Sequence, residues 1–180
     1  MSKPTDIQVS AAEVHFLSSP MRVPLKFGPE TVTSAVFLRV KVTVHDDKGR
    51  TAIGWGETPL SVSWVWPSTL SVAVRTDRMK SFSELLAKKI VSSSLRGHPM
   101  EIGQDFIHGG LATATQEAYA AAGGDPMPYL GSLVAFSAFD IAIHDAFGRL
   151  HERDIYTCYN ADFMNRDLAE YHVPANLDVP

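Results

Sequence analysis

The sequence predicts an α+β fold in which a three-stranded antiparallel sheet is followed by a helical bundle. Two patterns support this prediction. Residues 31–45 alternate apolar and polar side chains, as in a β-strand with one buried face. After residue 81 the apolar side chains recur at helical spacing instead. The chain has 180 residues, of which 45% are apolar and 20% are charged, so it is long enough to bury a core.

The three predicted strands lie between residues 7 and 55. In the first, the alternation changes phase near residues 11–12, which indicates a β-bulge. The second strand is predicted at residues 31–45. It is followed by residues typical of a turn at positions 46–49, and residues 51–55 form the third strand. Because the even-numbered side chains form the only continuous apolar face of the second strand, we expect Leu38 and Val40 to face the helices.

Three helical segments follow. A capping box at residues 81–84 predicts a helix to about residue 95. The second segment, residues 100–122, has a plausible break at residues 108–110. The third begins after Ser132 as its N-cap and runs to Leu150. Beyond it, residues 171–180 resemble the approach to a further strand.

The third helix is apolar on two sides. One side is a stripe of large residues, namely Phe136, Phe139, Ile143, Phe147 and Leu150. The other side is a face of small residues, namely Ala135, Ala138, Ala142 and Ala146. We expect that the surface of one sheet and two other helices is not large enough to cover both sides of this helix. Part of this surface is therefore predicted to be exposed, with self-association as a consequence.

Composition and charge exclude several classes of protein. The net charge of −4 gives no basic field for nucleic acid. The single cysteine, Cys158, excludes an internal disulfide framework. The N-terminus lacks the layout of a signal peptide, and no apolar run looks long enough to span a membrane. We therefore expect a cytoplasmic protein with no membrane or nucleic-acid partner.

All three tryptophans fall within residues 53–67, beside glycine and proline. Such a grouping indicates either a contact surface or a local aromatic cluster beneath a loop.

Four pieces of sequence, in this order and spacing, resemble the mandelate racemase and muconate lactonizing enzyme branch of the enolase superfamily. They are Pro24-Leu-Lys-Phe-Gly28, Gly54-Trp-Gly-Glu-Thr-Pro-Leu60, His98-Pro99 and residues 136–149. The likeness covers about residues 7–150. It implies an enolase N-terminal domain-like fold, with a capping α+β domain at residues 1–130. Residues 131–180 would then be the first elements of a (β/α) barrel.

The resemblance implies an enzyme in which the cap closes over the barrel. In this family a Mg²⁺ ion held by barrel carboxylates stabilises the enolate that forms when a base removes the proton α to a carboxylate. The reaction would be a racemisation, cycloisomerisation or dehydration of a small carboxylate. No Lys-X-Lys base motif occurs in this chain. We therefore expect the metal ligands and catalytic residues to lie in the barrel, and this chain alone to be inactive and to bind no cofactor.

By the same resemblance, two loops of the cap would reach over the substrate. These loops correspond to residues 18–27 and 54–66. The candidate substrate-binding residues in them are Met21, Arg22, Leu25, Lys26, Glu57, Trp64 and Trp66. Arg22 or Lys26 would attract an anion, whereas Glu57 is more often structural at such a turn.

Two other hypotheses stay open from the sequence. The chain could be a free-standing binding or assembly module that keeps the cap fold. Under either hypothesis it could form a homo-oligomer. Alternatively, Asp140 and His144, spaced four residues apart on one helix, could be two ligands of a small metalloenzyme, although no further ligands follow at a recognisable spacing.

Overall fold

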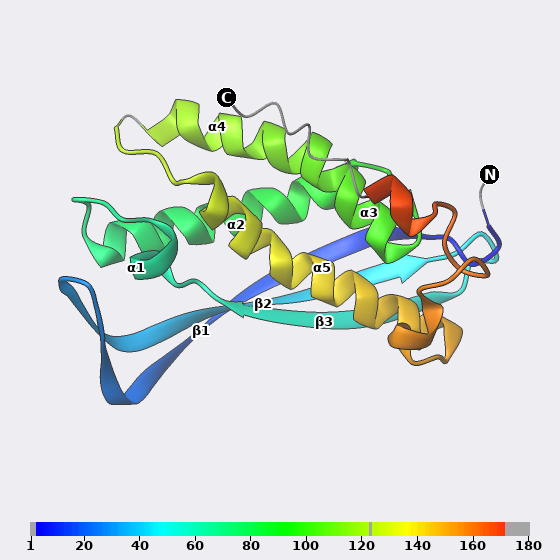
Figure 1. Ribbon diagram of the computed structural model, residues 1–180, viewed down its shortest axis with the longest axis horizontal. Helices are drawn as coiled ribbons and strands as arrows, with labels where there is room; N and C mark the ends of the chain where they lie inside the picture. The colour runs from blue at the N-terminus through cyan, green and yellow to red at the C-terminus, as the bar shows by residue number, and fades with distance from the viewer. Residues whose placement is uncertain (1–2, 123, 172–180) are drawn as a thin grey trace.

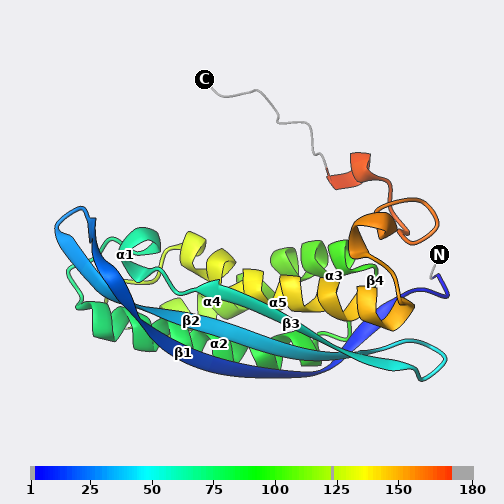
Figure 2. The same cartoon turned by 90° about the horizontal axis from the view of Figure 1, so that it is seen from below.

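A computed structural model describes residues 3–122 and 124–171 and has two layers, a sheet and a layer of helices (Figure 1). The sheet is antiparallel with strand order β3-β2-β1-β4. Its strands are β1 (Ile7–Phe27), β2 (Glu30–His45), β3 (Thr51–Pro59) and β4 (Arg96–Gly97). The predicted α+β class is therefore confirmed, with a fourth, two-residue strand that the sequence did not indicate. Figure 2 shows the sheet in front of the helices.

The hairpin of β1 and β2 is longer than the sequence predicted. Residues 18–27, expected to form a loop, continue β1 as an extended strand to the turn at Gly28. A second register shift, between Pro20 and Leu25, accommodates this extension, and the predicted bulge near residue 11 is confirmed by a shift between Val9 and Ala11. Prolines at positions 20 and 24 have no N–H to donate to the hydrogen bonds of a sheet, so the sequence pattern did not indicate a strand here.

The faces of β2 are oriented as predicted. Leu38 and Val40 are fully buried against the helices, whereas Arg39 is exposed and Lys41 only partly covered. The outer face is stabilised by cross-strand ion pairs, including one between Lys41 Nζ and Glu13 Oε1 at 2.8 Å. An antiparallel sheet with one wet face fits this division.

The helices cover the inner face of the sheet. They are α1 (Val62–Val65), α2 (Val72–Ser92), α3 (Pro99–Phe106), the π-helical η1 (Ile107–Leu111), α4 (Ala112–Ala122) and α5 (Tyr129–His151), followed by the 3-10 turns η2 (Ile155–Cys158) and η3 (Leu168–Tyr171). The predicted break at residues 108–110 is thus a π-helical turn between two α-helices. The segment predicted to lead into a further strand, residues 171–180, lies outside the described residues except for Tyr171.

Two helix starts differ from the prediction. Helix α2 begins ten residues before the predicted capping box, with Ser71 Oγ accepting the N–H of Val74 at 3.3 Å. Helix α5 begins at Tyr129, because Ser132 is buried and its hydroxyl instead accepts a hydrogen bond from Thr115 of α4 at 2.9 Å. In α5 a tertiary contact outweighs the local capping signal, whereas in α2 an earlier local cap begins the helix.

Helix α5 packs against β3 at unusually close range. A Cβ atom at Gly54 would lie 2.1 Å from the carbonyl oxygen of Ala142, and one at Gly56 would lie 2.0 Å from that of Ala138. Between the two glycines, the Trp55 N–H donates to Asp145 Oδ2 of α5 at 2.9 Å. The Gly-Trp-Gly segment is therefore the surface on which the alanine face of α5 lies.

The prediction that part of this helix is left uncovered on its apolar faces is wrong. The whole stripe and the whole alanine face are buried, with Phe136, Phe139, Ile143 and Phe147 each at most 2% exposed. The sheet covers the alanines, while α2, α3 and the chain after α5 cover the aromatic stripe. The exposed apolar residues of α5 are others, among them Leu130 and Ile141.

By length and composition α5 could cross a membrane, contrary to the expectation from the sequence that no segment is long enough. It is the one such helix among the described residues, and a mostly buried core helix passes the same test. The predicted domain boundary at residue 130 falls in the first turn of α5 and stays a prediction.

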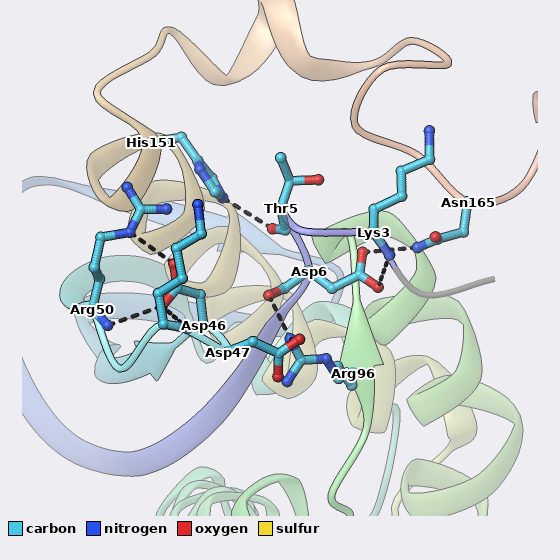
Figure 3. A network of polar contacts seen from close by, with 10 residues as sticks. Lys3, Thr5, Asp6, Asp46, Asp47, Arg50, Arg96, His151 and Asn165 are labelled. Atoms are coloured by element: carbon cyan, nitrogen blue, oxygen red, sulfur yellow. Dashed lines mark hydrogen bonds and ion pairs between the residues drawn. The ribbon is translucent and has the colours of Figure 1, made fainter.

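A polar network ties the start of the chain to its last described part, at the end of the sheet where β4 pairs (Figure 3). Asn165 Nδ2 donates to Asp6 Oδ1 at 2.9 Å, and the Arg96 guanidinium donates to the Asp6 carbonyl oxygen at 3.2 Å. The His151 ring bonds the Thr5 carbonyl oxygen at 3.0 Å. These bonds hold the segment after α5 against the core.

Candidate functional site

The largest cavity lies between the far end of the β1–β2 hairpin and helices α1 and α2. We call it the tip groove; its volume is about 930 Å³. Its walls are mostly apolar, and the residues that line it are Met21, Leu25, Phe27, Val32, Ser34, Ala35, Val36, Phe37, Pro59, Leu60, Ser61, Val62, Ser63, Trp64, Val72, Ala73, Thr76, Asp77 and Lys80. A cavity of this size and polarity suits a small organic ligand.

A buried arginine fixes the shape of this groove. Arg75 of α2 is 1% exposed, donates to the carbonyl oxygens of Trp66 at 2.7 Å and Val62 at 3.3 Å, and forms an ion pair with Glu30 at the start of β2. A hydrogen bond from Ser63 lowers the pKa of Glu30, partial burial opposes it, and the Arg75 interaction lowers it further. The hairpin is therefore tied to α1 and α2 by the ion pair between Glu30 and Arg75.

The structure brings only some of the predicted substrate-binding residues together. Met21 and Leu25 from the hairpin meet Trp64 of α1 across the tip groove, and Trp64 is 52% exposed. Arg22 and Lys26 are exposed and do not line the groove.

The other two candidates lie elsewhere. Trp66 is 1% exposed in the core, with the Arg78 guanidinium 6.0 Å from its ring centre. Glu57 is on the outer face of the sheet, where its Oε2 accepts from Arg39 Nε at 2.6 Å. The role of all seven residues in substrate binding stays a prediction.

The groove also contains residues that were not among the candidates, including several on the first turns of α2. Thr76 and Lys80 follow Val72 at intervals of four residues, a helical spacing that could have revealed them. Lys80 Nζ lies 3.3 Å from Asp77 Oδ1 and 6.0 Å from the centre of the Phe16 ring. Lys80 is the cationic side chain among the described lining residues of the groove.

The Asp140 and His144 pair does not extend to a metal centre. His144 Nδ1 lies 3.8 Å from Asp140 Oδ1 and 2.8 Å from the Asp140 carbonyl oxygen. Residues 3–122 and 124–171 contain no group of three or more His, Cys, Asp or Glu side chains able to hold a metal ion.

Behind this pair lies a fully buried histidine that begins α3. His98 Nδ1 accepts the N–H of Met100 at 3.2 Å, and the Glu101 carboxylate accepts the N–H of His98 at 3.0 Å, which completes a capping box. Its Nε2 atom has no hydrogen-bond partner among the described residues. Burial lowers the pKa of His98 from 6.5 to about 4; His144 adds to the effect, and Glu101 and Asp6 oppose it.

Because the folded state binds the proton less well than the unfolded chain, stability should rise with pH between 4 and 6.5. Acidification from pH 7 to pH 4 should lower the free energy of unfolding by about 3 kcal/mol through this group alone. Urea denaturation at several pH values measures this. His98→Asn, which keeps a capping side chain, should show a smaller slope in this range. Equal slopes in the two proteins would contradict the assignment.

Solved structures match the chain at low sequence identity. The L-Ala-D/L-Glu epimerase from Bacillus subtilis is 18% identical, with a TM-score of 0.43 and coverage of 80% of this chain and 32% of that one. An enolase from Bradyrhizobium complexed with magnesium and mandelic acid is 17% identical, with a TM-score of 0.46 and coverage of 84% and 34%. A mandelate racemase/muconate lactonizing enzyme-like protein from Rubrobacter xylanophilus is 22% identical, with a TM-score of 0.45 and coverage of 83% and 33%.

The chain thus spans about a third of the length of each of these proteins. No protein-family model matches the chain, and no curated protein matches it.

Proposed function

We propose that this chain is the N-terminal capping region of a mandelate racemase/muconate lactonizing enzyme-like protein. The observation that carries the proposal is the tip groove. It joins Met21 and Leu25 to Trp64, and these residues come from the two segments that the sequence resemblance assigns to the substrate lid. In such an enzyme the groove would enclose the apolar part of a small carboxylate and exclude water from it.

The proton transfer itself belongs to groups outside the described residues. A barrel, in the same polypeptide or another, would supply the base and the Mg²⁺ ligands, and the metal would stabilise the enolate formed next to the carboxylate. The residues described here would bind and orient the substrate. Lys80 is placed to attract its negative charge, although Asp77 partly neutralises that side chain.

The test begins with the reading frame beyond the codon for Pro180. If it encodes a barrel, the whole protein should exchange the α-proton of a carboxylic acid for deuterium in the presence of Mg²⁺, as followed by ¹H NMR. Residues 1–180 alone should not catalyse exchange. Trp64→Ala should raise KM more than it lowers kcat, because the residue contacts the substrate away from the reacting carbon.

Trp55→Phe is the matched control, because Trp55 lies on the outer face of the sheet and stacks on His15 with ring centres 6.3 Å apart. It should leave KM unchanged. Equal effects of both tryptophan variants, or exchange by residues 1–180 alone, would refute the proposed role.

A second candidate is a free-standing binding or assembly module with the cap fold. The observation in its favour is the fully buried aromatic stripe of α5, since this core closes without a barrel. A stop codon after Pro180, together with a monomeric chain that melts in a single cooperative transition, would favour this function over the first.

A further inference from the structure

A second cavity, between α3 and α5, lies outside the tip groove and has a volume of about 440 Å³. We propose that it binds a small organic ammonium ion with an apolar substituent. The inference concerns a ligand site of this chain itself and does not depend on the proposed capping function.

The first observation is a carboxylate that lacks a strong cationic partner. Asp140 lines this α3–α5 cavity, its side chain is 40% exposed, and no lysine or arginine is among the described lining residues. Its ion-pair partner in the described chain is His144, at 3.8 Å and charged only when protonated. A partly desolvated negative charge of this kind attracts a cation more strongly than a fully hydrated one does.

The neighbouring Asp145 shows the contrast on the same helix. Its Oδ2 accepts both from Arg149 Nε at 2.9 Å and from the Trp55 N–H at 2.9 Å. The charge of Asp145 is therefore already neutralised by an arginine. The charge of Asp140 is not.

The second observation is the chemistry of the walls. Aromatic rings of Phe136 and Tyr159 line the cavity together with the apolar side chains of Met100, Ile107 and Leu133. An ammonium group is attracted to the face of an aromatic ring as well as to a carboxylate, and its substituent can be buried against apolar walls. The negative charge of Asp140 would repel an anionic ligand. A neutral ligand would gain only the contact with the apolar walls.

The third observation is the glycine opposite the carboxylate. A Cβ atom at Gly103 of α3 would lie 2.5 Å from Asp140 Oδ1, so the absence of a side chain lets the carboxylate sit against α3 at the cavity wall. The other polar groups that line the cavity are Gln104, Ser137, His144 and the Tyr159 hydroxyl.

Titration behaviour agrees with this geometry. Burial raises the pKa of Asp140, and nearby His144 lowers it in part. Burial also raises the pKa of Tyr159, and the charge of Asp140 adds to that effect. An ammonium ion bound beside Asp140 should therefore lower the pKa of this carboxyl group, a shift that binding elsewhere would not produce.

The test uses benzylammonium chloride as the probe, with residues 1–180 labelled with ¹³C and ¹⁵N. NMR titration at pH 7 should shift the amides of α3 and α5 with saturation, and the Asp140 carboxyl ¹³C titration should move to lower pH. Benzyl alcohol and benzoate, which keep the ring but lack the positive charge, should each bind at least tenfold more weakly. Asp140→Asn should weaken benzylammonium binding at least tenfold.

Asp77→Asn is the matched control, because it removes a carboxylate that lines the tip groove instead, and binding should be unchanged. If Asp140→Asn does not fold, the pKa shift of Asp140 in the unaltered protein decides the question. Equal binding of benzylammonium and benzyl alcohol, or a saturating titration that leaves the Asp140 pKa in place, would overturn the proposal. The absence of any saturable shift at 10 mM probe, roughly the weakest affinity expected of a specific site, would do the same.

Discussion

Phe139→Glu should unfold the protein. Phe139 is 0% exposed at the centre of α5, and its ring stacks with that of Phe136 at a centroid distance of 6.5 Å. Glutamate at this position would bury a carboxylate without a partner and leave a cavity, which together should lower the free energy of unfolding by more than about 5 kcal/mol. This equals or exceeds the whole stability of many domains. Circular dichroism and size-exclusion chromatography should show loss of the cooperative transition and aggregation.

Ile141→Glu is the control on the same helix, two residues away and 48% exposed. This variant should fold with nearly unchanged stability and be more soluble, because it removes an apolar side chain from the surface. A folded, more soluble Phe139→Glu variant would mean that the aromatic stripe of α5 is exposed in solution.

Gly56→Ala should strongly destabilise the protein although it adds only one methyl group. Its Cβ atom would lie 2.0 Å from the Ala138 carbonyl oxygen and 2.7 Å from the Ala142 backbone nitrogen, so α5 would have to move away from β3. Such overpacking against backbone should cost about 3 kcal/mol or more. For a chain of this length, the melting temperature should fall by roughly 6–12 °C.

Gly109→Ala provides the comparison. A Cβ atom there would meet nothing within 4 Å, and the residue lies in the helical turn η1. Alanine should therefore leave the melting temperature unchanged or raise it slightly, because it restricts the unfolded chain. Similar losses in both variants would show that the close approach of α5 to β3 is not the cause.

The elements that the sequence predicted well have strong periodicity. Alternation along β2 reported correctly that Leu38 and Val40 face inward, and the apolar stripe of α5 identified a buried helix. The period of side-chain burial is a property of the backbone geometry, so it can be read without knowing the partners.

Capping and loop signals were less reliable. The capping box at residues 81–84 lies within α2, and Ser132 bonds to Thr115 instead of capping α5. The far end of β1 was hidden by two prolines and a bulge, yet six of the fifteen residue pairings between β1 and β2 lie in this part and hold it in the hairpin. The last two outcomes depend on contacts with residues outside the element itself.

The residues of the candidate site also differ in how far the sequence could predict their positions. The family resemblance predicted Trp64 as a lid residue, and this side chain lines the tip groove. Trp66, two residues later, lies in the core because α1 turns it inward beneath Arg78. Arg75 and Lys80 were missed because the helix that carries them was predicted to start after both.

The sequence by itself determined the α+β class, the inward face of β2 and the apolar character of α5, since these follow from periodic burial along one element. Only the tertiary structure decided that the sheet, α2, α3 and the segment after α5 together cover the aromatic stripe and the alanine face of that helix. It also decided that Asp140 faces a cavity with no lysine or arginine among its described lining residues, while Asp145 is neutralised by Arg149. The physical reason is that coverage and charge balance depend on which distant surfaces meet, and the pattern within one segment contains no information on its partner.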